Sequence, residues 1–399
     1  MSQAHTGRTA YVVDVVRSPF GRGRPGGTLS GAHPVDLLAD MLDAIVRRSE
    51  LDPAQVEDVI VGCVQQVGEQ AGNVGRHAVL AAGWPHTVPA TTLDRKCGSF
   101  QQAVSFAAQA VASGDQDLVV VGGVEMMSLI PMRTNRLGRD ELGSRFRARY
   151  PDGLVGQGIS AELIAARWNV SRQDLDAYAL RSHRRAAAAR DSGRLDDQIV
   201  PVTVGGVVVD RDQGIRDDTS LAALAGLRPA YRDEGMAARF PQIGWRVTAG
   251  NSSQITDGAA AALVASEQAV ERLGLHPQAR VVAAKVVGDD PVFMLTGVVP
   301  ATRSVLDRAG LTIADIDVAE VNEAFASVVL AWQAELSADP ETVNPWGGAI
   351  AFGHPVGASG GRLLANLLGR LDEIGGRFGL WTMCESGGMA NATVLERIS

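Results

Sequence analysis

The chain has 399 residues, of which 46% are hydrophobic and 21% are charged, and its net charge is -8. This length and apolar content allow a large core divided over two or three domains. The negative charge argues against nucleic acid as the main partner, and no apolar run is long enough for a membrane span. Three scattered cysteines and a polar first segment, Met1–Ala10, predict a cytoplasmic protein with no disulfide framework, zinc site or secretory signal.

The first predicted element is a buried strand at Tyr11–Val16, where valine dominates. Helical and strand patterns then alternate along the chain, which is typical of α/β layers. A short strand or loop is expected at 91–94, followed by a helix at 101–112, and another helix is expected at 171–192. We therefore predict an α/β fold.

A helix–turn–strand pattern at residues 45–61 returns at residues 305–321, and Leu51 and Leu311 mark an offset of 260 positions between the two copies. The same offset relates two further pairs, which are Ser99 with Ser359 and the segment 117–121 with 377–381. Repetition at one fixed offset indicates a duplicated α/β domain with a pseudo-twofold axis. An active site is expected between the two halves.

Residues 126–255 have no counterpart in this repeat, so we predict three domains. The first half comprises residues 1–125 plus 256–277, an inserted loop domain covers 126–255, and the second half covers 278–399. The insert contains an arginine-rich run at 133–149. Lysine is nearly absent from the chain, so this run is interpreted as a solvated charged loop, with an anion-binding patch as the alternative.

Cysteines 97 and 384 both stand beside Gly- and Ser-rich turns. Cys97 precedes the helix expected at 101–112, and the N–H groups of a helix N-terminus favour a thiolate nucleophile. Cys384 follows a predicted strand, and the N–H groups of the turn containing Ser386 can bind an oxyanion. An ordinary thiol pKa of about 8.5 would allow Cys384 to act as an acid or base. A buried structural cysteine is the alternative in each case.

A histidine and an asparagine are further candidate catalytic residues. His354 precedes Pro355 in a Gly-rich loop, which presents its ring outside a helix. Asn322 follows the strand that ends at Val321 and precedes a helix expected from Glu323. Its side chain could cap that helix, or it could hold a water that donates to an oxyanion.

Four motifs in order resemble those of the thiolases (acyl-CoA acetyltransferases) over essentially the whole chain. They are Cys97-Gly98-Ser99, Asn322-Glu323-Ala324-Phe325-Ala326, Gly353-His354-Pro355 with its glycine-rich flanks, and Cys384-x-x-Gly387-Gly388. The resemblance implies α/β/α/β/α layered halves related by a pseudo-twofold axis, with an inserted loop domain. The sequence around Cys384 most resembles that of degradative thiolases from actinobacteria, some of which act on bulky or steroid-derived chains.

The resemblance also implies roles. Cys97 would be the acylated nucleophile, and His354 would activate it. His354 and a water held by Asn322 would form one oxyanion hole, and the N–H groups of Cys97 and Ser386 would form the other. Cys384 would move the proton at the carbon that is attacked or released.

Coenzyme A enters this scheme as a substrate, with no resident cofactor and no metal. The insert would bind it, and the residues matching family contacts to CoA or the acyl group are Gln157, Arg216, Ala249, Ser253, Met294, Ala324 and Phe325. The partners implied are CoA and acyl-CoA, with no nucleic acid or membrane. The resemblance further implies a homodimer or a homotetramer.

The reaction implied is thiolysis of 3-ketoacyl-CoA to acetyl-CoA and a shortened acyl-CoA, in reversible balance with Claisen condensation. Gln157 and Ser386 depart from the short-chain pattern, so we expect a role in degradation, such as β-oxidation. A biosynthetic acetoacetyl-CoA thiolase is the alternative. A β-ketoacyl synthase, a non-catalytic acyl-CoA-binding protein and a cysteine hydrolase are less favoured, because the second cysteine and the full set of four residues fit a thiolase.

Overall fold

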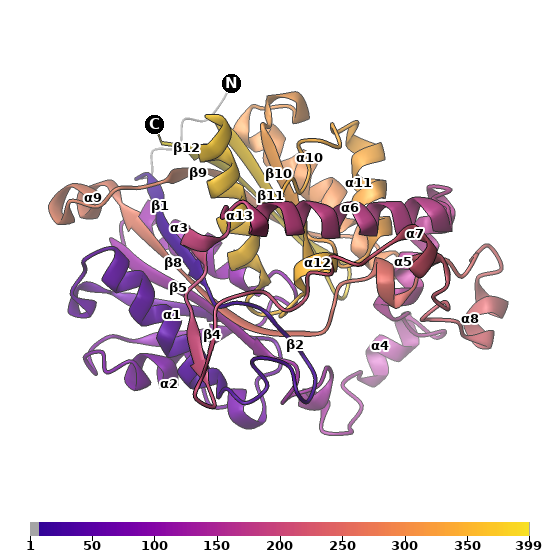
Figure 1. Ribbon diagram of the computed structural model, residues 1–399, viewed down its shortest axis with the longest axis horizontal. Helices are drawn as coiled ribbons and strands as arrows, with labels where there is room; N and C mark the ends of the chain where they lie inside the picture. The colour runs from indigo at the N-terminus through magenta and orange to yellow at the C-terminus, as the bar shows by residue number, and fades with distance from the viewer. Residues whose placement is uncertain (1–7, 399) are drawn as a thin grey trace.

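The computed structural model describes residues 8–398 and shows an α/β fold around one large sheet (Figure 1). One half of the sheet has the strand order β1 (Ala10–Arg17), β8 (Thr256–Ser266), β5 (Leu118–Met126), β3 (Asp58–Gly62) and β4 (Ala90–Leu93). The other half has the order β9 (Ala279–Gly288), β12 (Met389–Arg397), β11 (Phe378–Glu385) and β10 (Val318–Val321). The halves join where β1 pairs with β9, and the short β2 (Gly21–Arg22) pairs with β8.

The two halves repeat the same pairing scheme. From the join outward, each half has two antiparallel pairings followed by a parallel pairing, β1–β8–β5–β3 in one and β9–β12–β11–β10 in the other. The offset of 260 positions found in the sequence holds for the first residues of three element pairs, which are Asp58 and Val318, Ser99 and Ser359, and Leu118 and Phe378. The predicted α/β class and duplication are confirmed.

Helices form three layers around the two half-sheets. The central layer consists of α3 (Ser99–Ser113) and α13 (Ser359–Ile374), which contact each other and both halves (Figure 1). Next to the first half lie α1 (Pro34–Arg48) and α2 (Val74–Ala81), with α9 (Glu267–Leu273) after β8. Next to the second half lies α10 (Val298–Ala309), followed by α11 (Ala326–Leu336). The arrangement is therefore α/β/α/β/α.

Strand geometry explains how one sheet serves two helix layers. Ala259 and Ala261 of β8 belong to the core that α1 covers, whereas Ala260 and Ala262 belong to the core shared with α3 and α13. Successive side chains of a strand point to opposite faces, so a strand buried on both faces must be apolar throughout. The whole of β8 is buried accordingly.

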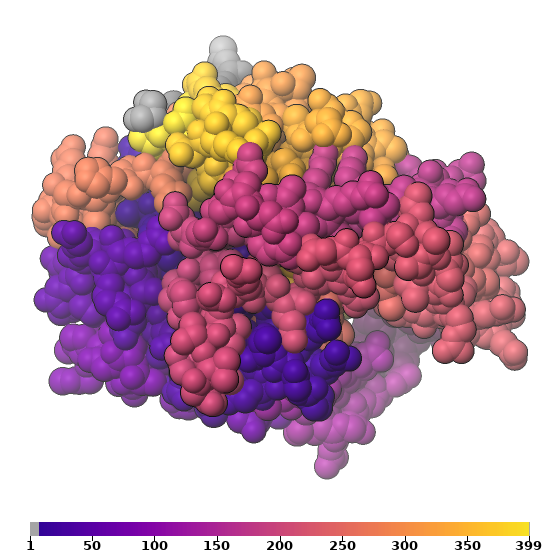
Figure 2. Space-filling view, viewed as in Figure 1, coloured from indigo at the N-terminus to yellow at the C-terminus, as the bar shows by residue number. Residues whose placement is uncertain are grey.

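Residues 127–255 add no strand to the large sheet. They form α4 (Ser144–Arg149), α5 (Gln157–Arg167), α6 (Arg172–Asp191), α7 (Leu221–Ala225), α8 (Glu234–Arg239) and a separate hairpin of β6 (Val202–Val204) and β7 (Val207–Val209). α6 begins after Ser171, whose side chain forms a capping box with Asp174, so the helix predicted at 171–192 is confirmed. Figure 2 shows the insert crossing the face between the first and last parts of the chain. The division into three domains stays a prediction.

The arginine-rich run is exposed, and its charges are partly paired. Arg147 contacts Asp140 at 2.6 Å and Arg136 contacts Glu141 at 2.5 Å. This agrees with a solvated charged loop. Over residues 8–398, no helix is both long enough and apolar enough to cross a membrane.

Candidate active site

The Cys97 turn and the His354 loop meet between the two halves of the sheet. A Cβ placed on Gly62, at the end of β3, would lie 2.8 Å from the backbone of Ser99 and 2.9 Å from the Gly357 carbonyl oxygen. Glu125 of β5 accepts hydrogen bonds from the Val64 N–H at 2.9 Å and the Gly357 N–H at 3.1 Å. The first half of the protein therefore holds a loop that belongs to the second half.

The other two motifs join the same region through β11. The Gln101 side chain of α3 donates to the Trp381 carbonyl at 2.8 Å, which fixes the start of α3 against this strand. The Asn322 N–H donates to the Thr382 carbonyl at 3.0 Å, two residues before Cys384. All four predicted chemical motifs therefore lie where α3 and α13 begin.

Cys97 is a buried thiol in the turn before α3. The Ser99 hydroxyl shapes this turn by donating to the Lys96 carbonyl at 2.6 Å and accepting from the Arg95 N–H at 2.9 Å. Burial and then the charge of nearby Glu385 raise the pKa of Cys97 to about 12, and a hydrogen bond from Gln157 opposes this rise. The prediction of a thiolate favoured by the helix N-terminus is wrong, because desolvation outweighs those contributions.

Cys384 is the next-to-last residue of β11 and is also fully buried. Burial raises its pKa well above the ordinary thiol value, and the charges of Cys97 and Glu385 raise it further. The prediction that its ordinary pKa brings it near neutral pH is therefore wrong in direction. A Cβ placed on Gly98, which follows Cys97, would lie 2.0 Å from a carboxyl oxygen of Glu385, which follows Cys384, so the two cysteine segments lie side by side.

The backbone before His354 adopts a conformation that requires glycine. Gly353 has a φ of +101°, and a Cβ there would lie 2.1 Å from the Thr256 hydroxyl oxygen. The His354 N–H donates to that hydroxyl at 3.0 Å and to the Gln254 carbonyl at 3.1 Å. The loop is thus fixed to the start of β8, and the imidazole is buried.

Hydrogen bonds at both ring nitrogens set the tautomer of His354. The Ser359 hydroxyl donates to the Pro355 carbonyl at 2.8 Å, so it accepts from His354 Nδ1–H at 2.5 Å. Nε2 then carries the lone pair and accepts from the Asn322 amide at 3.3 Å. Burial, followed by the charge of Arg362, lowers the pKa of His354 to about 3. The ring is a neutral base whose Nε2 carries no proton.

Asn322 does not cap the helix that follows it. α11 begins at Ala326, with Phe325 in the N-cap position, so the expectation of a helix from Glu323 is wrong. The intervening backbone pairs instead with another segment: the Ser253 N–H donates to the Ala324 carbonyl at 3.0 Å. The side-chain oxygen of Asn322 is buried without a hydrogen-bond partner, which leaves it free to hold a water or ligand group.

This pairing brings four predicted CoA contacts together. Ser253 lies against Ala324, and the preceding residue forms an isolated antiparallel bridge with Phe325. Ala249 belongs to the same short segment, a single turn of 3-10 helix at Ala249–Asn251. The ring of Phe325 meets Tyr231 of the insert edge-on at 5.9 Å.

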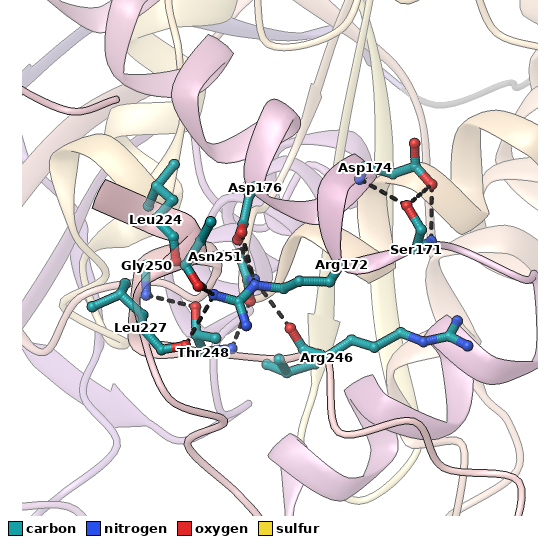
Figure 3. Close-up of polar contacts among 12 residues, drawn as sticks. Ser171, Arg172, Asp174, Asp176, Leu224, Leu227, Arg246, Thr248, Gly250 and Asn251 are labelled. Carbon is teal, nitrogen blue, oxygen red and sulfur yellow. Dashed lines mark hydrogen bonds and ion pairs between the residues drawn. The ribbon is translucent and has the colours of Figure 1, made fainter. Parts of the chain in front are cut away.

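A polar network from α6 holds the 249–251 turn in place (Figure 3). Asp176 accepts from the Asn251 amide at 2.9 Å and pairs with Arg172 at 2.7 Å. Arg172 in turn donates to the carbonyls of Leu224 at 2.5 Å and Leu227 at 3.0 Å. Asp176, through its partner Arg172, therefore joins α6 to the end of α7 and to the predicted CoA-binding turn.

Gln157 and Ser386 lie close to the thiols, and Met294 belongs to the same buried core as Cys384. Gln157 is the first residue of α5 and hydrogen-bonds Cys97. Met294 is buried in the turn Met294–Gly297, whose last residue lies against β12. Ser386 begins the turn between β11 and β12.

Arg216 lies apart from this group, on an exposed loop of the insert. Its N–H donates to His183 at 3.2 Å, and the pKa of Arg22 is lowered first by burial and then by the charges of Arg216 and Arg24. These three guanidinium groups therefore form one cationic cluster. Arg22 and Arg24 were not anticipated, because the first 30 residues carry no motif.

Sequence reasoning also missed Ser359, Asp176 and Glu385. Ser359 was matched to Ser99 by the repeat but not to His354, five positions away. Glu385 follows Cys384 directly, which was a signal, but its burial could not be read from the sequence. Among residues 8–398, no group of three His, Cys, Asp or Glu side chains is arranged to hold a metal ion.

Comparisons with known proteins agree with this geometry. The family model for the thiolase N-terminal domain matches residues 10–268, and that for the thiolase C-terminal domain matches residues 275–397. The chain is 48% identical over 397 residues to a steroid 3-ketoacyl-CoA thiolase (FadA6) of Mycobacterium tuberculosis, covering 98% of this chain and 94% of that protein.

More distant relatives show the same coverage. A 3-oxoadipyl-CoA/3-oxo-5,6-dehydrosuberyl-CoA thiolase of Escherichia coli is 42% identical over 412 residues, covering 98% of this chain and 100% of that protein. The crystal structure of an acetyl-CoA acetyltransferase from Bacillus anthracis superposes with a TM-score of 0.88 at 36% identity, covering 99% of this chain and 100% of that one. With the duplicated fold and the converging motifs, these matches show that the chain belongs to the thiolase family and is an acyltransferase that carries out CoA-dependent thiolysis.

Proposed function

We propose that the chain degrades 3-ketoacyl-CoA by thiolysis through an acyl-Cys97 intermediate, with His354, Asn322, Cys384 and Ser386 in the roles set out below. One observation carries this proposal. Two buried thiols meet a buried imidazole between the halves of the chain, and the hydrogen bond from its Nδ1–H to Ser359 leaves Nε2 unprotonated. Neither thiol needs to be ionised in advance if a base takes its proton during attack.

In the first half-reaction, Cys97 Sγ attacks the 3-keto carbon while His354 Nε2 takes the thiol proton. The tetrahedral oxyanion is stabilised by N–H donors, and its collapse breaks the bond between C2 and C3. The electron pair passes to the acetyl-CoA enolate, which takes a proton from Cys384 as acetyl-CoA forms. A water held by Asn322, together with His354 once it carries the thiol proton, would supply the donors for one oxyanion, and the N–H groups of Cys97 and Ser386 would supply those for the other.

In the second half-reaction, the thiol of free CoA attacks the acyl group on Cys97. Its proton returns to Cys384, which became a thiolate in the first step. Cys97 then leaves and regains its proton from His354. The cycle closes with both cysteines and the histidine in their original states, and no redox step is needed.

Coenzyme A is proposed to lie along the insert, residues 126–255. The segment at Ser253 would contact the pantetheine because it pairs with Ala324, two residues after Asn322, and so would the turn containing Ala249 that directly precedes this segment. Arg216, together with Arg22 and Arg24, forms a cationic cluster suited to the phosphates of CoA. Met294, Phe325 and Gln157 would line the acyl end.

The acylation test is direct. After incubation with acetoacetyl-CoA and removal of free CoA, an acyl mass should appear on the peptide that carries Cys97. Cys97→Ala should lose both the adduct and turnover. Full activity in Cys97→Ala, or an adduct only on another residue, would refute the assignment. Thioester hydrolysis without CoA as acceptor would instead support a cysteine hydrolase.

We propose that the acyl chain is longer than four carbons. The steroid 3-ketoacyl-CoA thiolase relative supports this choice, and so does Gln157 at the nucleophile in place of the short-chain pattern. A degradative thiolase should prefer such chains over acetoacetyl-CoA by about tenfold in kcat/KM. A preference for acetoacetyl-CoA would favour the biosynthetic alternative.

The assembly and location are proposed from the family alone. A homodimer or homotetramer in the cytoplasm fits the thiolase resemblance. Light scattering of the purified chain would distinguish these states from a monomer.

A further inference from the structure

Glu385 carries a buried carboxyl group for which the reaction outlined above has no use. It is the last residue of β11, directly after Cys384, and its exposed fraction is 0%. Neither carboxyl oxygen has a hydrogen-bond partner. A carboxylate without donors is costly to bury, so this side chain is most stable in its neutral form. Such a group in a native structure requires an explanation.

The carboxyl group fills the space between the two cysteine segments. A Cβ placed on Gly98, the residue after Cys97, would lie 2.0 Å from Glu385 Oε1, so the carboxyl packs directly against the nucleophile turn. Asn391 of β12 closes the same space by donating from its amide to the Gly98 carbonyl at 3.2 Å. Glu385 thus contacts one cysteine turn and follows the other cysteine in the chain.

The charged groups around Glu385 come from few elements. The segment between β4 and α3 contributes Arg95 and Asp94, and Asp94 is paired with Lys96 at 2.6 Å. From β12 comes the uncharged Asn391, and β11 itself contributes Cys384. Burial raises the pKa of Glu385 to about 8, Arg95 lowers it and Asp94 raises it. A charge on Glu385 raises the pKa of both Cys97 and Cys384.

We propose that Glu385 is a positioning residue that must stay protonated: its neutral carboxyl supports the Gly98 turn, and loss of its proton at alkaline pH places a negative charge beside both thiols and opposes thiolate formation at each. This inference deepens the proposed function, on which the roles of the two cysteines rest. Thiol reactivity should therefore rise with pH less steeply than for an isolated thiol once Glu385 ionises.

The test compares wild type with Glu385→Gln, which keeps the shape and removes the charge. Alkylation of Cys97 by iodoacetamide is followed by peptide mass spectrometry from about pH 6 to about pH 10. The two rates should agree below about pH 7, and above about pH 9 the variant should react about tenfold faster, as for a shift of one pKa unit. The alkaline limb of kcat for thiolysis should move in the same direction.

Two further variants secure the test. Asp94→Asn removes a neighbouring acid whose charge raises the pKa of Glu385, and it leaves Glu385 in place, so the bend in the alkylation profile should persist but lie at a lower pH. Glu385→Met replaces the carboxyl by an apolar chain of similar length and serves if the Gln variant does not fold. Parallel profiles for wild type and either Glu385 variant would overturn the proposal. Alkylation needs no turnover, so a diverging profile in a protein without thiolysis would refute the proposed function and leave the inference about Glu385 intact.

Discussion

At the residue scale, the two thiols of the site have higher pKa values than the sequence predicted. Helix N-termini and nearby cations lower thiol pKa values in many active sites, and the glycine-rich setting of Cys97 suggested the same here. The structure buries both cysteines, and desolvation dominates. A motif predicts which residue types come together in a site. The burial of each thiol depends on strands and helices that are hundreds of positions away in the sequence, so no local pattern predicts it.

Mutation of the two cysteines should impair different steps of the reaction. Cys384→Ala should still accept an acetyl group from acetyl-CoA on Cys97, because that transfer removes no proton from carbon. Condensation and exchange of the α-proton should fall by roughly 10²–10⁴-fold, the usual effect of losing a general base. Labelled acetyl-CoA measures the first step and deuterium incorporation measures the second. Near-normal condensation would assign the proton transfer to another group, and His354 would be examined next.

Ser359 should affect rate more than binding. In Ser359→Ala the Nδ1–H of His354 loses a buried acceptor, at a cost of about 1–3 kcal/mol, and the tautomer with a free Nε2 is no longer fixed. We expect kcat to fall by about tenfold or more with little change in KM for CoA. Stopped-flow acylation of Cys97 would locate the loss in the first half-reaction. A rise in KM with unchanged kcat would show that Ser359 acts elsewhere.

At the element scale, the repeat was the most reliable sequence signal. The offset of 260 positions predicted matching strands and helices, and the first residues of β3, α3 and β5 have counterparts at that distance. The start of α11 was predicted too early, because residues 322–325 look helical by composition. Their backbone pairs with residues 252–253, a contact across about 70 positions of sequence that local propensity cannot encode.

The junction at Asp176 gives a prediction for the insert. Asp176→Asn weakens the ion pair with Arg172 and reorders the hydrogen bond to Asn251, so the 249–251 turn should lose its fixed position. KM for CoA should rise about tenfold while acylation of Cys97 by a small thioester reagent is retained. Arg190→Gln, which removes a half-buried arginine of α6 paired with Asp217, is the matched control and should leave KM unchanged. Equal KM values in both variants would exclude the junction from CoA binding.

At the scale of the whole molecule, buried acids should make stability depend on pH. Burial raises the pKa of both Glu320 and Glu385 to about 8, above their values in the unfolded chain. Between those values the folded state binds more protons than the unfolded state, so stability falls as pH rises from about 5 to about 8. Below that window both states are protonated, and this penalty is absent.

Glu385→Gln should remove part of this dependence. Urea unfolding at about pH 5 should give similar midpoints for wild type and variant, and at about pH 8 the variant should be more stable by on the order of 2 kcal/mol. A difference that is independent of pH would show that the substitution acts through packing alone.

Ser99 and Ser359 occupy equivalent positions in the repeat, and their different contacts show that the two halves contribute different groups to the site. Both residues begin a central helix, at equivalent places in the two copies of the repeat. In the first copy the Ser99 hydroxyl stabilises the turn that carries Cys97, and in the second the Ser359 hydroxyl accepts a hydrogen bond from His354 Nδ1–H. The duplicated fold thus provides the nucleophile Cys97 from one half and the base His354 from the other, each beside the start of a central helix. Neither half contains the complete active site. A fragment with only one half would therefore retain its central helix but should have no thiolase activity.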